Sequence, residues 1–171
     1  MWVSTTTDTQ SLTPPVVRQP DGVGKRVGQV AEITVIAQVA PGGAAKYRQN
    51  AAKIQNDAFY YEALVGTVHD FRVTFFNHDT QAVLAVTFDG DFKPYIQDIF
   101  TNAWQWFDKQ FTGVLEGYPG SKDPGITQWV LDRMVEANMW YASYPDATVK
   151  DITKGQKVLQ AFNTLLDTAS S

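Results

Sequence analysis

The chain contains no cysteine, and only two histidines, His69 and His78, occur in its 171 residues. The lack of cysteine excludes disulfide bonds, thiolate metal sites and cysteine nucleophiles. Two histidines nearly exclude a metal site built from several imidazoles, so we expect no bound metal. Carboxylates, arginines, hydroxyl groups and the two histidines remain as the side chains that could carry chemistry.

The charge pattern lacks a basic run, and the formal net charge is −4. Both features argue against a partner with a nucleic-acid backbone. No apolar run approaches the roughly 20 residues of a membrane span. The N-terminus also lacks the basic and apolar regions of a secretory signal. We therefore expect a cytoplasmic protein that binds neither nucleic acid nor membrane.

Recognisable catalytic motifs are absent as well. Gly22-Val23-Gly24 does not form a strand-to-helix turn and lacks the third glycine of a dinucleotide-binding fingerprint. No nucleophile elbow with a Ser-His-Asp order is present. Asp89 and Asp91 are explained by a helix start, with Asp91 as its N-cap, and two carboxylates alone are a weak calcium signal. Whether the protein is an enzyme is therefore left open.

Aromatic residues are abundant, with 5 Trp, 7 Tyr and 10 Phe, and the hydrophobic content is 44%. Such a chain can bury a core of large rings. The same residues would also suit an aromatic-lined pocket or an oligomer interface, where aromatic side chains are enriched. Composition alone does not choose between these interpretations.

The first 28 residues differ from the rest of the chain. They are polar, are interrupted by prolines and glycines, and show neither a strand nor a helix period. We interpret residues 1–28 as an extended arm that packs on another subunit, and residues 29–171 as one α+β domain.

The domain shows clear hydrophobic periodicity. Period-two alternation predicts strands at 31–39, 67–76, 81–88 and 138–144. Apolar residues three and four apart predict helices at 44–63, 92–111, 126–136 and about 154–168. The order predicts a ferredoxin-like βαββαβ fold, with a four-stranded antiparallel sheet and all helices on one face.

The opposite face of that sheet is mixed and polar. By alternation it carries Glu32, Thr34, Gln38, Asp70, Arg72, Thr74, Thr87 and Asp89. An exposed sheet face is commonly covered, and a second copy of the sheet would cover it. We therefore predict a homodimer or a larger homo-oligomer built on this face.

Three segments resemble the dimeric α+β barrel superfamily, in an uncharacterised bacterial subgroup. They are Thr67 to Arg72, Phe88 to Asp91 with Tyr95 and Ile96, and Trp140 to Pro145. The resemblance implies two ferredoxin-like subunits packed sheet to sheet. The superfamily includes cofactor-free oxygenases, small-molecule lyases, haem peroxidases and chlorite-degrading enzymes, so the fold does not select a reaction. The haem-ligand signatures of those families have no match in this sequence.

Three residues on the second predicted strand, His69, Asp70 and Arg72, are the candidates for catalysis. Arg72 could bind an anionic group through its planar fork, and Asp70 or Glu32 could act as a general base. The alternative is an ordinary ion pair on the sheet. His69 is the one histidine on a regular element, so a general base or haem ligand from histidine would be His69. Alternation places it with Phe71, which favours a buried histidine bonded to the backbone.

A pocket on the polar face would add five candidate ligand-binding residues: Glu32, Thr34, Thr74, Thr87 and Tyr141. We therefore expect a protein that binds, or acts on, a small molecule that is partly apolar or anionic. No cofactor is expected, with haem as the one exception considered. The alternative function is non-catalytic, namely a structural or assembly protein that uses its arm and aromatic surface.

Overall fold

A computed structural model describes residues 14–22 and 24–169 of the chain. Those residues form six strands, β1 (Val17–Arg18), β2 (Lys25–Val27), β3 (Val30–Gln38), β4 (Val68–Phe76), β5 (Gln81–Asp89) and β6 (Met134–Val135). They also form five helices, α1 (Gly43–Val65), α2 (Phe92–Asn102), α3 (Trp104–Phe111), α4 (Ile126–Leu131) and α5 (Val149–Ala169).

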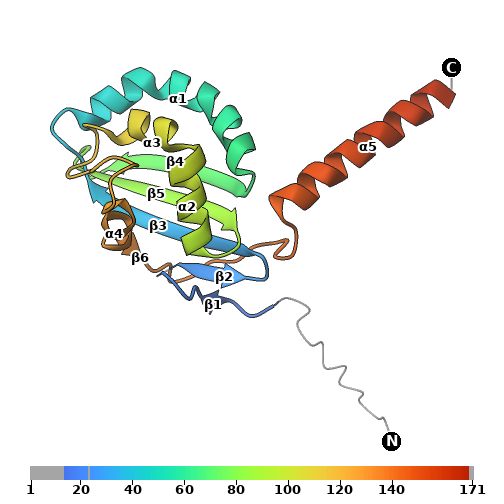
Figure 1. Ribbon diagram of the computed structural model, residues 1–171, viewed down its shortest axis with the longest axis horizontal. Coiled ribbons are helices and arrows are strands. Elements are labelled where there is room, and N and C mark those ends of the chain that lie inside the picture. Colours follow the sequence, from blue (N-terminus) through green and yellow to red (C-terminus); the bar gives the residue numbers. More distant parts are fainter. Residues whose placement is uncertain (1–13, 23, 170–171) are drawn as a thin grey trace, which may run out of the picture.

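The strands form one antiparallel sheet in the order β1-β2-β3-β5-β4, and β6 also pairs with β3. β3 and β5 pair along their whole length, from Val30 opposite Asp89 to Gln38 opposite Gln81. Helices α1, α2 and α3 lie together on one face of this sheet (Figure 1). The domain is therefore a two-layer α+β structure, in which the sheet buries its apolar face under helices.

The prediction of a four-stranded ferredoxin-like βαββαβ sheet, and of a barrel made from two such sheets, was wrong. The order β3-α1-β4-β5-α2 was predicted correctly, but the sheet has six strands. Residues 138–144 form no strand, because residues 25–27 and 134–135 already occupy the free edge of β3. Met139, Tyr141 and Tyr144 instead lie exposed in the segment before α5.

The described part of the N-terminal arm joins the sheet of its own chain. β1 pairs with β2, and β2 pairs with β3. Val27 is only 1% exposed, and the Gln19 side-chain amide donates a hydrogen bond to the Glu32 carbonyl over 2.9 Å. β1 and β2 thus extend the sheet, whereas the prediction for residues 1–13 lies outside the described residues.

Two glycines set the ends of α1. Gly42 precedes the helix with φ 75° and Gly66 follows it with φ 66°, both in the left-handed region where glycine is favoured. The Gly66 N–H donates to the Glu62 carbonyl over 2.6 Å, which satisfies one carbonyl of the last turn. These caps explain why a helix of 23 residues starts and ends cleanly around the predicted span 44–63.

The predicted helix 92–111 is divided at Ala103 into α2 and α3. Ala103 has φ −122° and ψ 13°, outside the helical region, so α3 leaves in a new direction. The Trp106 indole N–H then donates to the Ile54 carbonyl on α1 over 2.9 Å. Asp91 makes no capping hydrogen bond at the start of α2, because its carboxylate pairs with Arg26.

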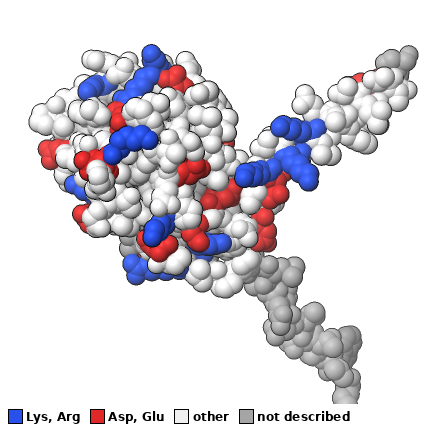
Figure 2. Space-filling model, viewed as in Figure 1, with Lys and Arg blue, Asp and Glu red and all other residues white. Residues whose placement is uncertain are grey.

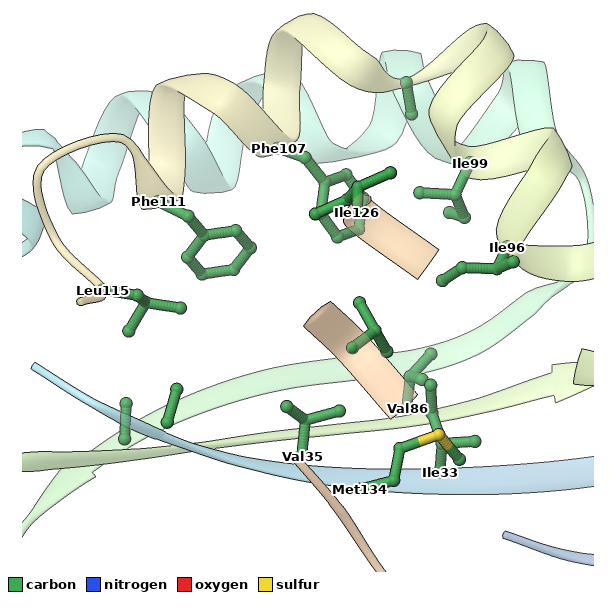
Figure 3. Close-up of a cluster of buried hydrophobic side chains, with 14 of the residues drawn as sticks. Ile33, Val35, Val86, Ile96, Ile99, Phe107, Phe111, Leu115, Ile126 and Met134 are labelled. Carbon is green, nitrogen blue, oxygen red and sulfur yellow. The ribbon is translucent and has the colours of Figure 1, made fainter. Parts of the chain in front are cut away.

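The core lies between the centre of the sheet and helices α2 and α3. Ile33, Val35 and Val86 of the sheet face Phe107 and Phe111 of α3 (Figure 3). This contact fixes α3 over the middle strands. The predicted helix 126–136 ends at residue 131, and the chain continues into β6. Ile126 and Val130 of α4 and Met134 of β6 all belong to the core.

Helix α5 extends away from the sheet and its covering helices (Figure 1). It has 21 residues, none of which is buried. Of the helices in the described ranges, none combines the length and hydropathy that crossing a lipid bilayer requires.

Candidate functional site

A cavity of about 650 Å³ lies between α1 and the edge strand β4. Residues of α2 and α3 complete its wall, and it is partly open to solvent. Ligand pockets in proteins commonly measure roughly 300–1,000 Å³, so this cavity could hold a small organic molecule. It lies on the helix-covered face of the sheet, opposite the polar face on which the sequence placed a pocket.

Small side chains create this space. Ala51 and Ala58 on α1, and Ala103 between α2 and α3, all line the cavity. Leucine at such positions would fill the gap between helix and strand, as expected for a close-packed interior. The alanines therefore leave the space between α1 and β4 unfilled without interrupting the helix.

Seven of the 21 residues that line the cavity are aromatic. Phe71 of β4 lies 5.4 Å from Trp106 of α3, and Tyr61 of α1 stacks on the same indole at 6.3 Å, centroid to centroid. Rings that hold each other in this way lose little freedom when a ligand arrives. The wall therefore offers rigid, flat surfaces that suit an apolar or aromatic group.

Gln110 supplies a polar group to this apolar wall. It is 1% exposed, and its Oε1 accepts a hydrogen bond from the Tyr47 hydroxyl over 3.1 Å. Its Nε2 is buried and has no hydrogen-bond partner among the described residues. Burial raises the pKa of Tyr47 to about 12, so the tyrosine stays a neutral donor that orients the amide. A buried N–H donor without a partner calls for an acceptor.

His69 lies on a β-bulge at the start of β4. The register between β4 and β5 shifts between Val68 and Asp70, which leaves His69 as the extra residue. Its Nε2 lies 2.7 Å from Oδ1 of Asp89. The bulge also turns Val68 toward the core, whereas strict alternation predicted it on the polar face.

Asp70 and Arg72 also line the cavity, on the β4 side. Arg72 Nη1 lies 3.5 Å from Asp70 Oδ1, and the Arg72 side chain is 69% exposed. An ion pair with so long a distance between its charged atoms, and with exposed side chains, contributes little to stability. The three residues predicted for catalysis, His69, Asp70 and Arg72, all belong to the β4 side of the cavity lining. Alternation with Phe71 and Val73 turns the Asp70 and Arg72 side chains toward the exposed face of this edge strand.

The five residues predicted to bind a ligand do not line this cavity: Glu32, Thr34, Thr74, Thr87 and Tyr141. Glu32 is 5% exposed and accepts a hydrogen bond from the Lys25 N–H over 2.8 Å. Burial raises its pKa above 4.5, and the bond from Lys25 opposes that shift. Tyr141 is 68% exposed in the segment before α5.

Sequence reasoning missed Gln110, Trp106 and Tyr47 as site residues. Tyr47 lies on the apolar stripe of the predicted helix 44–63, which indicates ordinary packing, whereas Trp106 and Gln110 lie outside the stripe of the predicted helix 92–111. The one available signal was the pair of small residues, Ala51 and Ala58, on the apolar stripe of α1. A gap between a packed helix and strand cannot be recognised from the hydrophobic period of either element.

Over residues 14–22 and 24–169, no three histidine, aspartate or glutamate side chains gather as a metal site would require. Comparisons with protein families, with characterised proteins and with solved structures found no match to this chain. They identify no family, and the resemblance to the dimeric α+β barrel superfamily stays an untested prediction.

Proposed function

We propose that this protein binds a small molecule with a flat, mainly apolar ring system in the cavity between α1 and β4. The observation that carries the proposal is the buried Gln110 amide, whose Nε2 has no hydrogen-bond partner among the described residues and lies at the wall of a cavity of about 650 Å³. A ligand that places a carbonyl or another acceptor against this amide would satisfy it.

The lining also suggests the polarity of the other end of the ligand. Arg72 belongs to the edge strand β4 beside the cavity and is 69% exposed, so its long side chain can turn around that edge to meet an anionic group at the opening. The ligand class is therefore an aromatic compound with an acceptor at its buried end and an acidic group near the opening. This class agrees with the partly apolar or anionic ligand expected from the sequence.

A cavity-filling substitution on α1 tests the proposal. Ala51 lines the cavity, whereas Ala52, the next residue on the same helix, is exposed and does not line it. We expect Ala51→Phe to occupy part of the cavity with its ring and Ala52→Phe to leave the cavity unchanged. The probe is anilinonaphthalene sulfonate, a fluorescent aromatic anion of the proposed class, titrated into the parent and both variants.

The expected result is a loss of at least ten-fold in probe affinity for Ala51→Phe and none for Ala52→Phe. Any probe bound by exposed apolar side chains elsewhere is common to all three proteins and cancels in the comparison. Circular dichroism and thermal melting must show that Ala51→Phe remains folded. Equal titration curves for folded Ala51→Phe and the parent would overturn the proposed binding site.

A further inference from the structure

The apolar stripe of α5 lies open to solvent. Six large side chains form it, with exposed fractions from 42% to 64%: Ile152, Val158, Leu159, Phe162, Leu165 and Leu166. Most helices in proteins gain their stability from packing an apolar face rather than from intrinsic propensity. A continuous exposed stripe of this kind marks an interaction surface.

The start of α5 is fixed to the rest of the chain. The Val149 N–H donates to Asp89 Oδ2 over 2.8 Å, and the Pro145 carbonyl accepts from the Gln29 N–H over 2.7 Å. Thr148 and Asp151 form a reciprocal capping pair, in which each backbone N–H donates to the other side chain, over 3.2 and 3.1 Å. Held at this point, the helix projects beyond its own sheet (Figure 1).

We propose that the stripe of α5 pairs in antiparallel orientation with α5 of a second copy of this chain. Ile152, Leu159 and Leu166 recur every seven residues, as do Gly155, Phe162 and Ala169. Two interleaved seven-residue repeats provide the a and d positions of a heptad, through which two helices pack. This inference is independent of the proposed ligand site.

Side-chain sizes match in the antiparallel register that sets Leu159 against Phe162 of the second copy. In that register Gly155 faces Leu166 and Ile152 faces Ala169, so a small residue meets a large one in each outer layer. Apart from its two chain neighbours and the backbone of its own helix, no atom of the described residues lies within 4 Å of the position that a Cβ at Gly155 would occupy. The glycine therefore leaves a recess on the stripe for a leucine from the other helix.

The charges on α5 favour the antiparallel orientation. Lys150, Lys154 and Lys157 lie in the first half of the helix, and Figure 2 shows basic side chains gathered there, beside the rest of the molecule. In a parallel pair, each of these lysines would lie beside the same lysine of the second helix. In the antiparallel register Lys154 lies about 20 Å from its counterpart along the axis. That separation exceeds the Debye length of about 8 Å at physiological ionic strength.

The first test compares two aspartate substitutions on α5 in the full chain. Leu159→Asp puts a charge in the seam, whereas Gln160→Asp adds the same charge next to it, off the stripe. Sedimentation equilibrium should show a dimer for the parent and for Gln160→Asp, and loss of the dimer for Leu159→Asp. Circular dichroism checks that the sheet and its covering helices remain folded.

The second test reads the orientation directly, because the chain has no cysteine of its own. Ile152→Cys and Ala169→Cys, oxidised separately, should each remain uncrosslinked, and a mixture of the two should form a disulfide-linked pair. Crosslinking of Ile152→Cys with itself would overturn the antiparallel arrangement. A parent that stays monomeric at 100-fold varied concentration, or that binds phosphatidylserine vesicles as a monomer, would overturn the pairing.

Discussion

Nε2 of His69 lies 2.7 Å from Oδ1 of Asp89, while Oδ2 of the same carboxylate accepts a hydrogen bond from the Val149 N–H over 2.8 Å. The Asp89 side chain is 11% exposed and that of His69 is 20% exposed. One carboxylate at the end of β5 thus joins the bulge of β4, a wall of the cavity and the start of α5. The position of α5 depends on this residue.

We expect Asp89→Ala to lower the free energy of unfolding by about 1–3 kcal/mol, because both N–H partners lose their acceptor in a partly buried place. It should also free the start of α5. Limited proteolysis should therefore cut the chain near residue 149 faster than in the parent, and urea unfolding gives the change in stability.

His69→Ala is the matched control, since it removes the imidazole but leaves Asp89 to bond the Val149 N–H. Cleavage near residue 149 should proceed at the parent rate in this variant. Equally fast cleavage in both variants would show that Asp89 does not hold α5 through Val149.

The part of the fold that sequence reasoning predicted correctly consists of long elements with a clean period. β3, β4 and β5 each have nine residues and mostly alternate apolar with polar side chains. β1, β2 and β6 have only two or three residues each, too few to show any period. Their positions depend on the free edge of β3, which is a tertiary feature.

The catalytic role predicted for His69, Asp70 and Arg72 stays a prediction. The pocket was expected on the polar face of the sheet, whereas the cavity that these residues help to line is on the helix-covered face. The bulge that leaves His69 as the extra residue follows from pairing with β5, which single-strand alternation cannot show. The cavity itself arises where Ala51 and Ala58 face an edge strand, so only the packed structure reveals it.

Phe88 should be among the most sensitive core positions. It is 0% exposed, and its ring stacks on Tyr95 with 3.9 Å between centroids. Phe88→Ala is expected to lower the free energy of unfolding by about 3–5 kcal/mol, through lost burial and the void that remains. Phe76→Ala, at a side chain 39% exposed on β4, is the control and should cost under about 1 kcal/mol. Similar losses in urea unfolding would contradict this account of the core.

Glu32 should make stability depend on pH. Burial raises its pKa above 4.5, so the folded state binds this proton more tightly than the unfolded chain does. Its contribution is therefore most favourable below pH 4.5 and is lost as the pH rises through the raised pKa. Each unit of difference corresponds to about 1.4 kcal/mol.

Glu32→Gln should remove this dependence, because the amide keeps an oxygen for the Lys25 N–H but does not ionise. We expect the variant to be more stable than the parent at pH 7, with the difference shrinking toward pH 4, in unfolding by urea at both pH values. Glu116→Gln, at an exposed side chain, is the control and should follow the parent. A parent-like pH profile for Glu32→Gln would show that burial does not perturb this carboxyl.

Arg72 offers the sharpest test of the ligand's polarity, and its outcome rests on the proposed cavity. Because its side chain is 69% exposed and lies 3.5 Å from Asp70, Arg72→Lys should change the free energy of unfolding by less than about 0.5 kcal/mol. The substitution keeps the charge but loses the planar fork that binds an anion through two N–H groups. Affinity for anilinonaphthalene sulfonate should therefore fall several-fold without loss of stability.

Arg18→Lys, on exposed β1 and away from the cavity lining, is the matched control and should bind like the parent. If both arginine variants bind the probe equally while Ala51→Phe does not, the cavity binds an apolar ligand and Arg72 does not contact its acidic group.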